Sequence, residues 1–320
     1  MKSEGRAESH NSEAASETIR KPLSFARPKA SGQDLPSSGK IEEMNETRAS
    51  EEVRTAPYSV LSGKKQKGGD RMHFYITGDT HGNFSRIAAF CRTQHTTRED
   101  VLIILGDVGL NYFLDERDRQ RKEKVAALDI TLFCIHGNHE ARPWEAKSYE
   151  EKLWMGARVY AEPDYPNLLF AKDGEIYTMR GKRVLAIGGA YSVDKEYRLS
   201  YGYRWFESEQ PSEEIKAYTE RQLKAADWRV DYVLSHTVPL DFEPVWSFLP
   251  GLDQSKVDKR TEQWLQTLHD RLDIREGWYA GHYHCCCEGN GLRILFEDYG
   301  EICREEETSA EGGMPTEGIL

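Results

Sequence analysis

The sequence has no apolar run long enough to cross a membrane, which takes about 18 or more consecutive hydrophobic residues. Residues 1–6 also lack the apolar segment of a secretory signal peptide. These absences give no reason to expect a membrane partner, and we expect the chain of 320 residues to be cytoplasmic.

Positive charge is in short supply. The chain has 43 Lys and Arg residues against 54 Asp and Glu residues, a formal net charge of -11. Non-specific binding to nucleic acid needs a basic face, so we do not expect it. A small phosphorylated substrate remains compatible with this balance, because bound dications can dominate the local field.

The six cysteines form no disulfide framework and no C-x-x-C pair. Cys285, Cys286 and Cys287 are consecutive and therefore cannot readily bridge each other. We interpret them as a reduced, strand-borne cysteine cluster, since free cysteine is among the most buried residue types. A redox role stays open, but nothing in the sequence supports it.

Composition divides the chain into three parts. Residues 1–71 are rich in Ser, Glu, Lys and Ala without apolar periodicity, which predicts a disordered N-terminal extension. The acidic residues 304–320 are predicted to be a disordered tail. Residues 72–303 are predicted to form the folded domain.

The pattern from Met72 alternates strands with helices and then changes to consecutive short strands. Helices are predicted over 83–95, 115–128, 143–154, 212–227 and 257–272. Strands are predicted over 74–77, 101–105, 131–135, 157–161, 168–171, 175–179, 183–187, 231–235, 277–281 and 292–296. Short strands after a β-α-β opening predict a mixed sheet and leave room for a second sheet packed on it.

Five of the predicted strands run directly into polar residues of the same few types. The residues at these five strand ends are Asp79 and His81, then Asp107, then Asn138 and His139, then His236, then His282 and His284. Carboxylate, amide and imidazole groups suit divalent transition metals. The repetition of this construction predicts a metal site.

The number and spacing of these donors favour two ions. Asp79 and His81 are two residues apart at a strand end, so both point to the same side, and His282 and His284 share that geometry. Asp107 has two oxygens and can bridge two ions. Seven ligands are too many for one tetrahedral zinc, whereas two-ion sites are typical of displacement at phosphorus.

The five blocks D-x-H, G-D, G-N-H-[DE], H and G-H-x-H, found between about residues 72 and 298, resemble those of the calcineurin-like metallophosphoesterases. The resemblance implies an α/β fold: a four-layer αββα sandwich of two mixed β-sheets flanked by helices. It also implies hydrolysis of a phosphate monoester or diester by in-line attack of a metal-bridging hydroxide.

The resemblance further implies residue roles and cofactors. Asp79, His81 and His284 match the ligands of one metal. Asn138, His236 and His282 match the ligands of the other, and Asp107 matches the bridge. His139 matches the general acid that protonates the leaving group. Manganese, iron and zinc all fit these oxygen and nitrogen donors.

This chain departs from the phosphoprotein phosphatases of the superfamily, which carry G-D-x-V-D-R-G and R-G-N-H-E. Leu110 replaces the second Asp of the first block, Asn111 replaces its Arg, and His136 replaces the Arg before Gly137. These changes argue against a phosphoprotein phosphatase. The block 188–195 instead looks like that of bacterial and phage members.

We hypothesise that Asn111 and an arginine, Arg198 or Arg204, bind the phosphate in place of the two arginines that are missing here. Both arginines lie in the aromatic segment 188–210. That segment is either a substrate-facing lid or a loop packed on its own surface, and the sequence leaves both readings open.

The sequence is also compatible with two functions other than a general phosphoesterase. One is a scaffold that keeps this fold for protein binding with a decayed catalytic centre, although none of the seven ligands is substituted. The other is a nuclease or cyclic-nucleotide phosphodiesterase. The acidic balance weighs against a long nucleic acid, but a mononucleotide remains open.

Overall fold

The computed structural model describes residues 72–304. The predicted extension 1–71 and residues 305–320 of the predicted tail lie outside the described residues. Within this range none of the helices has the length and apolar character needed to cross a bilayer.

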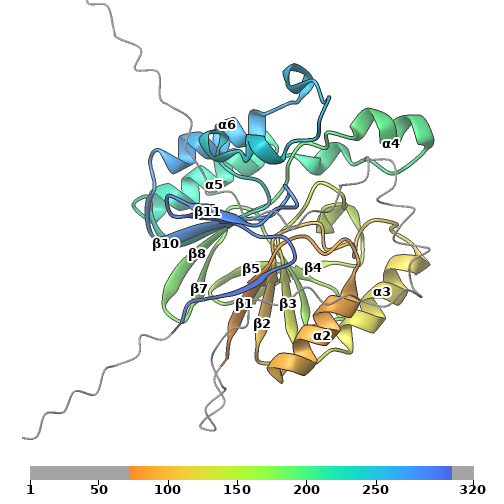
Figure 1. Ribbon diagram of the computed structural model, residues 1–320. Helices are drawn as coiled ribbons and strands as arrows, with labels where there is room; N and C mark the ends of the chain where they lie inside the picture. The colour runs from red at the N-terminus through yellow and green to blue at the C-terminus, as the bar shows by residue number, and fades with distance from the viewer. Residues whose placement is uncertain (1–71, 305–320) are drawn as a thin grey trace, which may run out of the picture.

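Two β-sheets form the centre of the molecule (Figure 1). The seven-stranded sheet has the order β13-β1-β2-β3-β6-β5-β4, and the six-stranded sheet has the order β11-β12-β10-β9-β8-β7. The strands of the first sheet are β1 (Phe74–Thr77), β2 (Val101–Ile104), β3 (Thr131–Cys134), β4 (Glu150–Trp154), β5 (Ala157–Ala161), β6 (Leu168–Ala171) and β13 (Tyr299–Ile302). The strands of the second are β7 (Ile176–Met179), β8 (Lys182–Ile187), β9 (Arg229–Ser235), β10 (Asp273–Ala280), β11 (Cys287–Gly289) and β12 (Leu292–Ile294).

Both sheets are mixed, as the sequence predicts. β1, β2, β3 and β6 are parallel, while β13, β5 and β4 add antiparallel pairs at the two edges. In the second sheet β8, β9, β10 and β12 are parallel, with β7 and β11 antiparallel at the edges.

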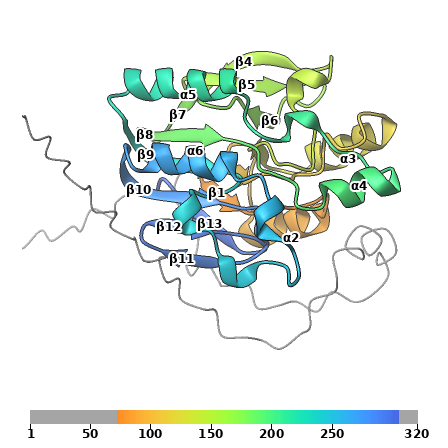
Figure 2. The same ribbon diagram turned by 90° about the horizontal axis from the view of Figure 1, so that it is seen from above.

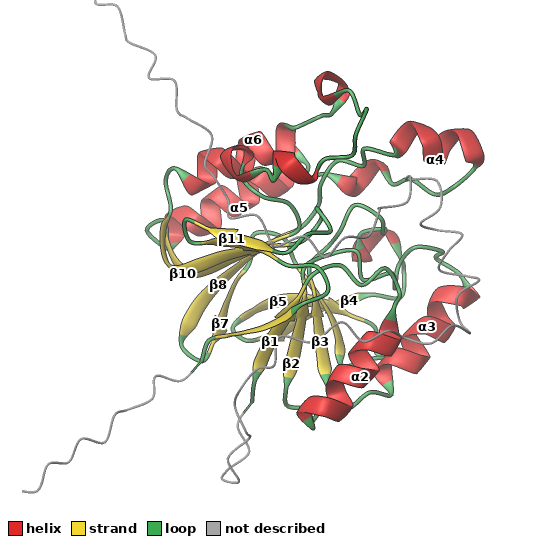
Figure 3. Cartoon of the chain, viewed as in Figure 1, coloured by secondary structure: helices red, strands yellow, loops and turns green. Residues whose placement is uncertain are grey.

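Helices cover the outer face of each sheet (Figures 1 and 3). α2 (Phe84–Gln94) and α3 (Glu116–Ala126) lie on the first sheet, and α5 (Glu213–Ala225) and α6 (Arg260–His269) lie on the second. α4 (Lys195–Tyr201) stands apart from both layers. The predicted four-layer αββα sandwich is therefore confirmed.

The apolar runs of the strands explain this layering, because successive side chains in a strand point to opposite faces. In β2, Ile103 packs into the cluster between the two sheets, together with Tyr232 and Leu234 of β9. Its neighbours Leu102 and Ile104 pack into a second cluster under α2 and α3. A third cluster lies between the second sheet and α5 and α6.

The predicted helix over 143–154 is wrong. Only Pro143–Glu145 forms a short 3-10 turn, η2, and β4 follows as an edge strand paired antiparallel with β5. The local sequence resembles a helix, but Trp154 packs its ring on Phe133 at 4.9 Å between centroids. Pairing and packing with distant residues thus override local propensity.

Besides β4, two short strands are absent from the sequence prediction, and the strand predicted over 292–296 is among those that are shorter than expected. β13 pairs with β1, and β11 pairs with β12, which ends at Ile294. The segment 188–210 also contains a helix, α4, and a 3-10 turn, η3 (Glu207–Glu209). The loop before α6 holds three more 3-10 turns, η4 (Leu240–Phe242), η5 (Val245–Ser247) and η6 (Gln254–Lys256).

Candidate metal centre

The candidate ligands all follow the carboxyl ends of parallel strands. Asp79 and His81 come after β1, Asp107 after β2 and Asn138 after β3, while His236 follows β9 and His282 and His284 follow β10. Parallel strands present their carboxyl ends at one edge, which is where open α/β sheets place ligands. Figure 2 shows α4 lying beyond that end of the sheets.

Backbone hydrogen bonds hold the loops of the first sheet together. His81 N donates to Asp107 O at 2.7 Å, and Gly82 N donates to Val108 O at 3.1 Å. The carboxylates bind further loops, since Asp107 Oδ1 accepts from His139 N at 2.8 Å. These bonds fix the relative positions of the loops that carry the candidate ligands.

Two glycines are required for the close approach of these loops. A Cβ at Gly106, whose φ is +106°, would overlap the imidazole of His236. A Cβ at Gly137 would overlap the carboxylate of Asp107. Gly106 therefore allows His236 of the second sheet to approach, and Gly137 allows the loops after β2 and β3 to approach each other.

Four candidate ligands adopt a left-handed backbone. The φ angles are 46° at His81, 47° at Asp107, 68° at His282 and 49° at His284. Residues other than glycine are uncommon in this region, and such strain costs on the order of 1–3 kcal/mol each. Strained backbone often occurs at functional sites, so its presence at four of the seven candidate ligands agrees with a functional role for this edge.

Asp79, His81 and His284 form a first group of converging donors. His81 Nε2 lies 2.9 Å from His284 Nε2, and Asp79 Oδ2 lies 3.2 Å from the same His284 nitrogen. Burial raises the pKa of Asp79, but His284 and His236 outweigh it and lower the pKa to about 2. The carboxylate is therefore ionised and ready to bind a cation.

Asn138, His236 and His282 form a second group. Asn138 Oδ1 lies 2.7 Å from His236 Nε2 and 3.1 Å from His282 Nδ1. His236 Nδ1 lies 2.7 Å from the carbonyl oxygen of Leu105, to which only an N–H can donate. In neutral His236, Nε2 therefore carries a lone pair that faces the Asn138 oxygen.

With neutral His236, two acceptors 2.7 Å apart repel each other, and a cation beside both relieves that repulsion. The donor set therefore fits a metal ion at this position. Asp107 joins the two groups, because its carboxylate lies within reach of His81 and His139 on one side and of Asp79 and His236 on the other. The structure thus brings all seven predicted ligands together.

His139 lies at the same edge and contacts a buried arginine. Its Nδ1 is 2.6 Å from Arg198 Nη2, and its Nε2 is 3.7 Å from Asp194 Oδ1. Guanidinium only donates, so Nδ1 accepts and Nε2 carries the proton of the neutral ring. Burial lowers the pKa of His139 to about 4, with Arg198 adding to the effect and Asp107 opposing it.

The predicted substrate-binding residues differ in where they lie. Arg198 is 1% exposed and also donates to Asp194 Oδ2 and to the carbonyl oxygen of Arg204. The Arg204 side chain is exposed. Asn111 is buried, and its Oδ1 accepts from the Tyr149 hydroxyl at 2.9 Å rather than from a metal-site residue.

Ser192, Asp194 and Glu140 are site residues that sequence reasoning missed. Asn138 Nδ2 donates to Ser192 Oγ at 2.9 Å, and Gly137 N donates to Glu140 Oε1 at 3.1 Å. Burial raises the pKa of Glu140 to about 8. Glu140 is the last residue of the G-N-H-[DE] block, and Ser192 and Asp194 lie in the block 188–195. The sequence motifs therefore include all three residues but do not reveal their contacts.

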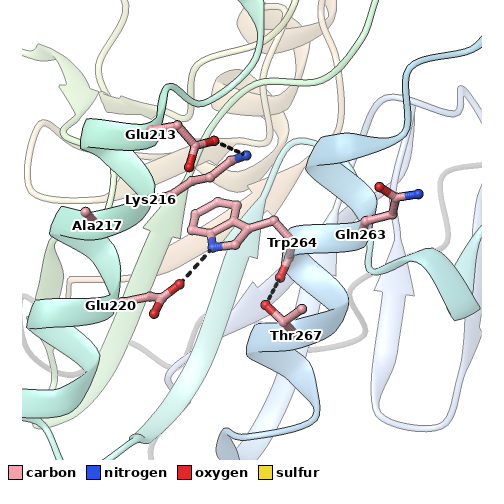
Figure 4. A pocket seen from close by; sticks show the side chains of 7 residues that line it. All are labelled: Glu213, Lys216, Ala217, Glu220, Gln263, Trp264 and Thr267. Atoms are coloured by element: carbon pink, nitrogen blue, oxygen red, sulfur yellow. Dashed lines mark hydrogen bonds and ion pairs between the residues drawn. The ribbon is translucent and has the colours of Figure 1, made fainter.

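A separate pocket lies between the helices on the outer face of the second sheet, and none of the site residues lines it. Figure 4 shows it between α5 and α6, lined by Glu213, Lys216, Ala217, Glu220, Gln263, Trp264 and Thr267. Lys216 Nζ pairs with Glu213 at 2.8 Å, and the Trp264 indole donates to Glu220 at 3.4 Å. Its polar groups are thus largely engaged with each other, and it offers no catalytic group.

This chain belongs to the calcineurin-like phosphoesterase family, whose family model matches residues 72–286. Membership implies metal-dependent hydrolysis of phosphoester bonds, and the Asp and His groups described above can hold the metal ions. A search of curated proteins gave no significant match.

Solved structures match at low identity. TT1561 of Thermus thermophilus is 13% identical, with 70% of this chain and 88% of that chain covered and a TM-score of 0.38. AQ665 of Aquifex aeolicus, a protein of unknown function, is 16% identical, with coverages of 54% and 82% and a TM-score of 0.26. Another crystal structure is 14% identical, with coverages of 71% and 94% and a TM-score of 0.40. These scores are below 0.5, so the assignment depends on the family model.

Proposed function

We propose that this protein is a dinuclear metal-dependent phosphoesterase that hydrolyses a small phosphate monoester or diester, with His139 as the general acid. The observation that carries the proposal is the approach of Asn138 Oδ1 to the lone pair of His236 Nε2 at 2.7 Å, beside Asp107. A metal cation beside the two acceptors would remove their mutual repulsion.

Asp79, His81 and His284 would hold one ion, Asn138, His236 and His282 the other, and Asp107 both. Two divalent ions bound there would lower the pKa of a water molecule and neutralise the phosphoryl oxygens. Manganese, iron and zinc all suit these donors.

Arg198 Nη2 faces Nδ1 of His139 at 2.6 Å, so Nε2 is the ring nitrogen that can face the leaving group. A general acid must lie within hydrogen-bond reach of the departing oxygen and present its proton toward it. The partly exposed ring faces the same edge as the seven ligands, and its Nδ1 lies 4.0 Å from Asp107 Oδ2. This geometry supports the role implied by the family resemblance.

Arg204, rather than Arg198, is the arginine that we propose to bind the phosphate of the substrate. Arg204 has an exposed side chain, whereas the Arg198 guanidinium is buried and already bonded to His139 and Asp194. The role of Asn111 stays a prediction, since its carboxamide oxygen is bonded to Tyr149. The small phosphorylated substrate and the cytoplasmic location expected from the sequence also stay predictions.

A hydrolysis screen with manganese-reconstituted protein tests the proposal. Aryl monoesters and diesters should be compared side by side, with Asp107→Asn as the control that removes the shared ligand's charge. Turnover that requires both added metal and Asp107 supports the phosphoesterase. A metal-loaded chain without activity on either ester class would favour the scaffold alternative.

A further inference from the structure

A series of buried hydrogen bonds, called the relay below, fixes the side chain of Asn138 through its amide nitrogen. Asn138 Nδ2 donates to Ser192 Oγ at 2.9 Å. Burial raises the pKa of Glu209, and hydrogen bonds from the Ser192 hydroxyl and backbone N–H to its carboxylate oppose that shift. The Trp205 indole donates to Glu209 Oε2 at 2.7 Å, which fixes the far end of the relay. Ser192 is 1% exposed and Glu209 is 2% exposed, so water does not compete for these bonds.

The relay has only one consistent direction when Glu209 is ionised. A carboxylate accepts hydrogen bonds and cannot donate them, so the single proton of the Ser192 hydroxyl must point at Glu209. The Ser192 oxygen is then an acceptor toward Asn138. The Asn138 nitrogen must face Ser192, and the Asn138 oxygen must face His236 and His282.

The opposite orientation of the Asn138 amide would point its N–H group, instead of its oxygen, at the position of the second metal ion. A flipped Asn138 would direct Nδ2 at His236 Nε2, which carries a lone pair because Nδ1 bonds Leu105. That contact is a good hydrogen bond in the absence of metal. Without the relay, the carboxamide would therefore gain a bond by turning its donor toward the position of the ion.

Resting on the proposed function, we infer that Ser192 and Glu209 are positioning residues for the second metal ion. They hold the Asn138 oxygen toward that ion and prevent the flip that would replace it by an N–H donor. Both residues lie in the segment 188–210, so this segment completes the metal site from outside the ligand-bearing loops.

Calorimetric titration of the full chain with Mn²⁺ tests this inference. Ser192→Ala should bind one ion as tightly as the wild type and the second about 10–100-fold more weakly, as is usual when a partner of a metal ligand is lost. Glu209→Gln keeps the shape but can donate to Ser192, so it should weaken the same ion. Glu207→Gln, an exposed change in the same 3-10 turn, should leave both affinities unchanged.

A double-mutant cycle separates positioning from structural damage. Asn138→Asp presents an oxygen in either orientation, so in that background Ser192→Ala should no longer weaken the second ion. An equal loss in both backgrounds, or unchanged affinity in Ser192→Ala and Glu209→Gln, would overturn the inference. The readout is metal affinity, so a wild type that binds two ions without hydrolysing esters would count against the proposed function alone.

Discussion

The Arg198 guanidinium donates from Nη2 to Nδ1 of His139 across 2.6 Å. This contact fixes which imidazole nitrogen carries the proton and ties α4 to the residue proposed as the general acid. It also places a positive charge where a histidine partner is more often a carboxylate or carbonyl.

His139→Ala should keep its metal ions and lose most of its turnover. Removal of a general acid commonly lowers the rate about 10²–10⁴-fold. The loss should be largest for an alkyl ester, whose leaving oxygen needs a proton, and smaller for an activated aryl ester. Steady-state kinetics on both ester types, with metal content measured in parallel, checks this. Full activity on the alkyl ester would contradict the assigned role.

Arg198→Ala and Arg204→Ala should affect different kinetic parameters. Loss of Arg198 removes the bond that orients His139, so kcat should fall by about 10-fold or more with a smaller change in KM. Loss of the exposed Arg204 should mainly raise KM for a phosphorylated substrate. Metal content should stay the same in both variants. An unchanged KM in Arg204→Ala would show that Arg204 does not bind the substrate.

Asp173→Ala should destabilise the fold strongly. Asp173 pairs with Arg142, which is 1% exposed, and also accepts a hydrogen bond from Gly188 N at the start of the segment 188–210. Removing one partner of a buried pair costs about 3–5 kcal/mol, because the other charge stays buried. Urea unfolding measures the change.

The control for this variant is an exposed ion pair on α3. Glu116 pairs with Arg119, and both side chains are more than half exposed. Glu116→Ala should therefore cost less than about 1 kcal/mol. A similar small cost for Asp173→Ala would show that the buried pair does not hold the segment in place.

Glu262→Gln should change how stability depends on pH. Burial raises the pKa of Glu262 from 4.5 to about 7, and Thr237 donates to its Oε1 at 2.8 Å. The folded state then binds the proton more tightly than the unfolded state, so this contribution is full below pH 4.5 and is lost as pH rises through about 7.

Glutamine imitates the protonated form and does not titrate. The stability of Glu262→Gln relative to the wild type should therefore rise by about 2 kcal/mol between about pH 5.5 and about pH 8.5. Urea unfolding of both metal-free proteins at these two pH values provides the measurement. Parallel pH profiles would show that Glu262 is not protonated in the folded state.

The sequence predicts the ligand-bearing core well because the relevant signals are local. An apolar run such as residues 101–105 that stops at Gly106 and Asp107 identifies both a buried strand and the side chain at its end. Parallel strands then bring such ends to one edge. The four-layer arrangement itself came from the family resemblance, and the three core clusters bear it out.

The features missed by sequence reasoning depend on distant pairs. β4 is a strand because β5 and the ring of Phe133 are beside it, although its own residues favour a helix. The Ser192 contact with Asn138 joins residues 54 positions apart. No local periodicity records such a contact, so the supporting groups of the site become visible only in three dimensions.

The most direct test of the account is the number of Mn²⁺ ions bound by the wild type and by Asp107→Asn. Equilibrium dialysis with metal analysis should give two ions per wild-type chain, with electron paramagnetic resonance showing a coupled pair. Asp107→Asn should lose that coupling and bind at least one ion more weakly. A wild type that binds no more than one ion, or a pair unaffected by Asp107→Asn, would contradict the shared role of Asp107.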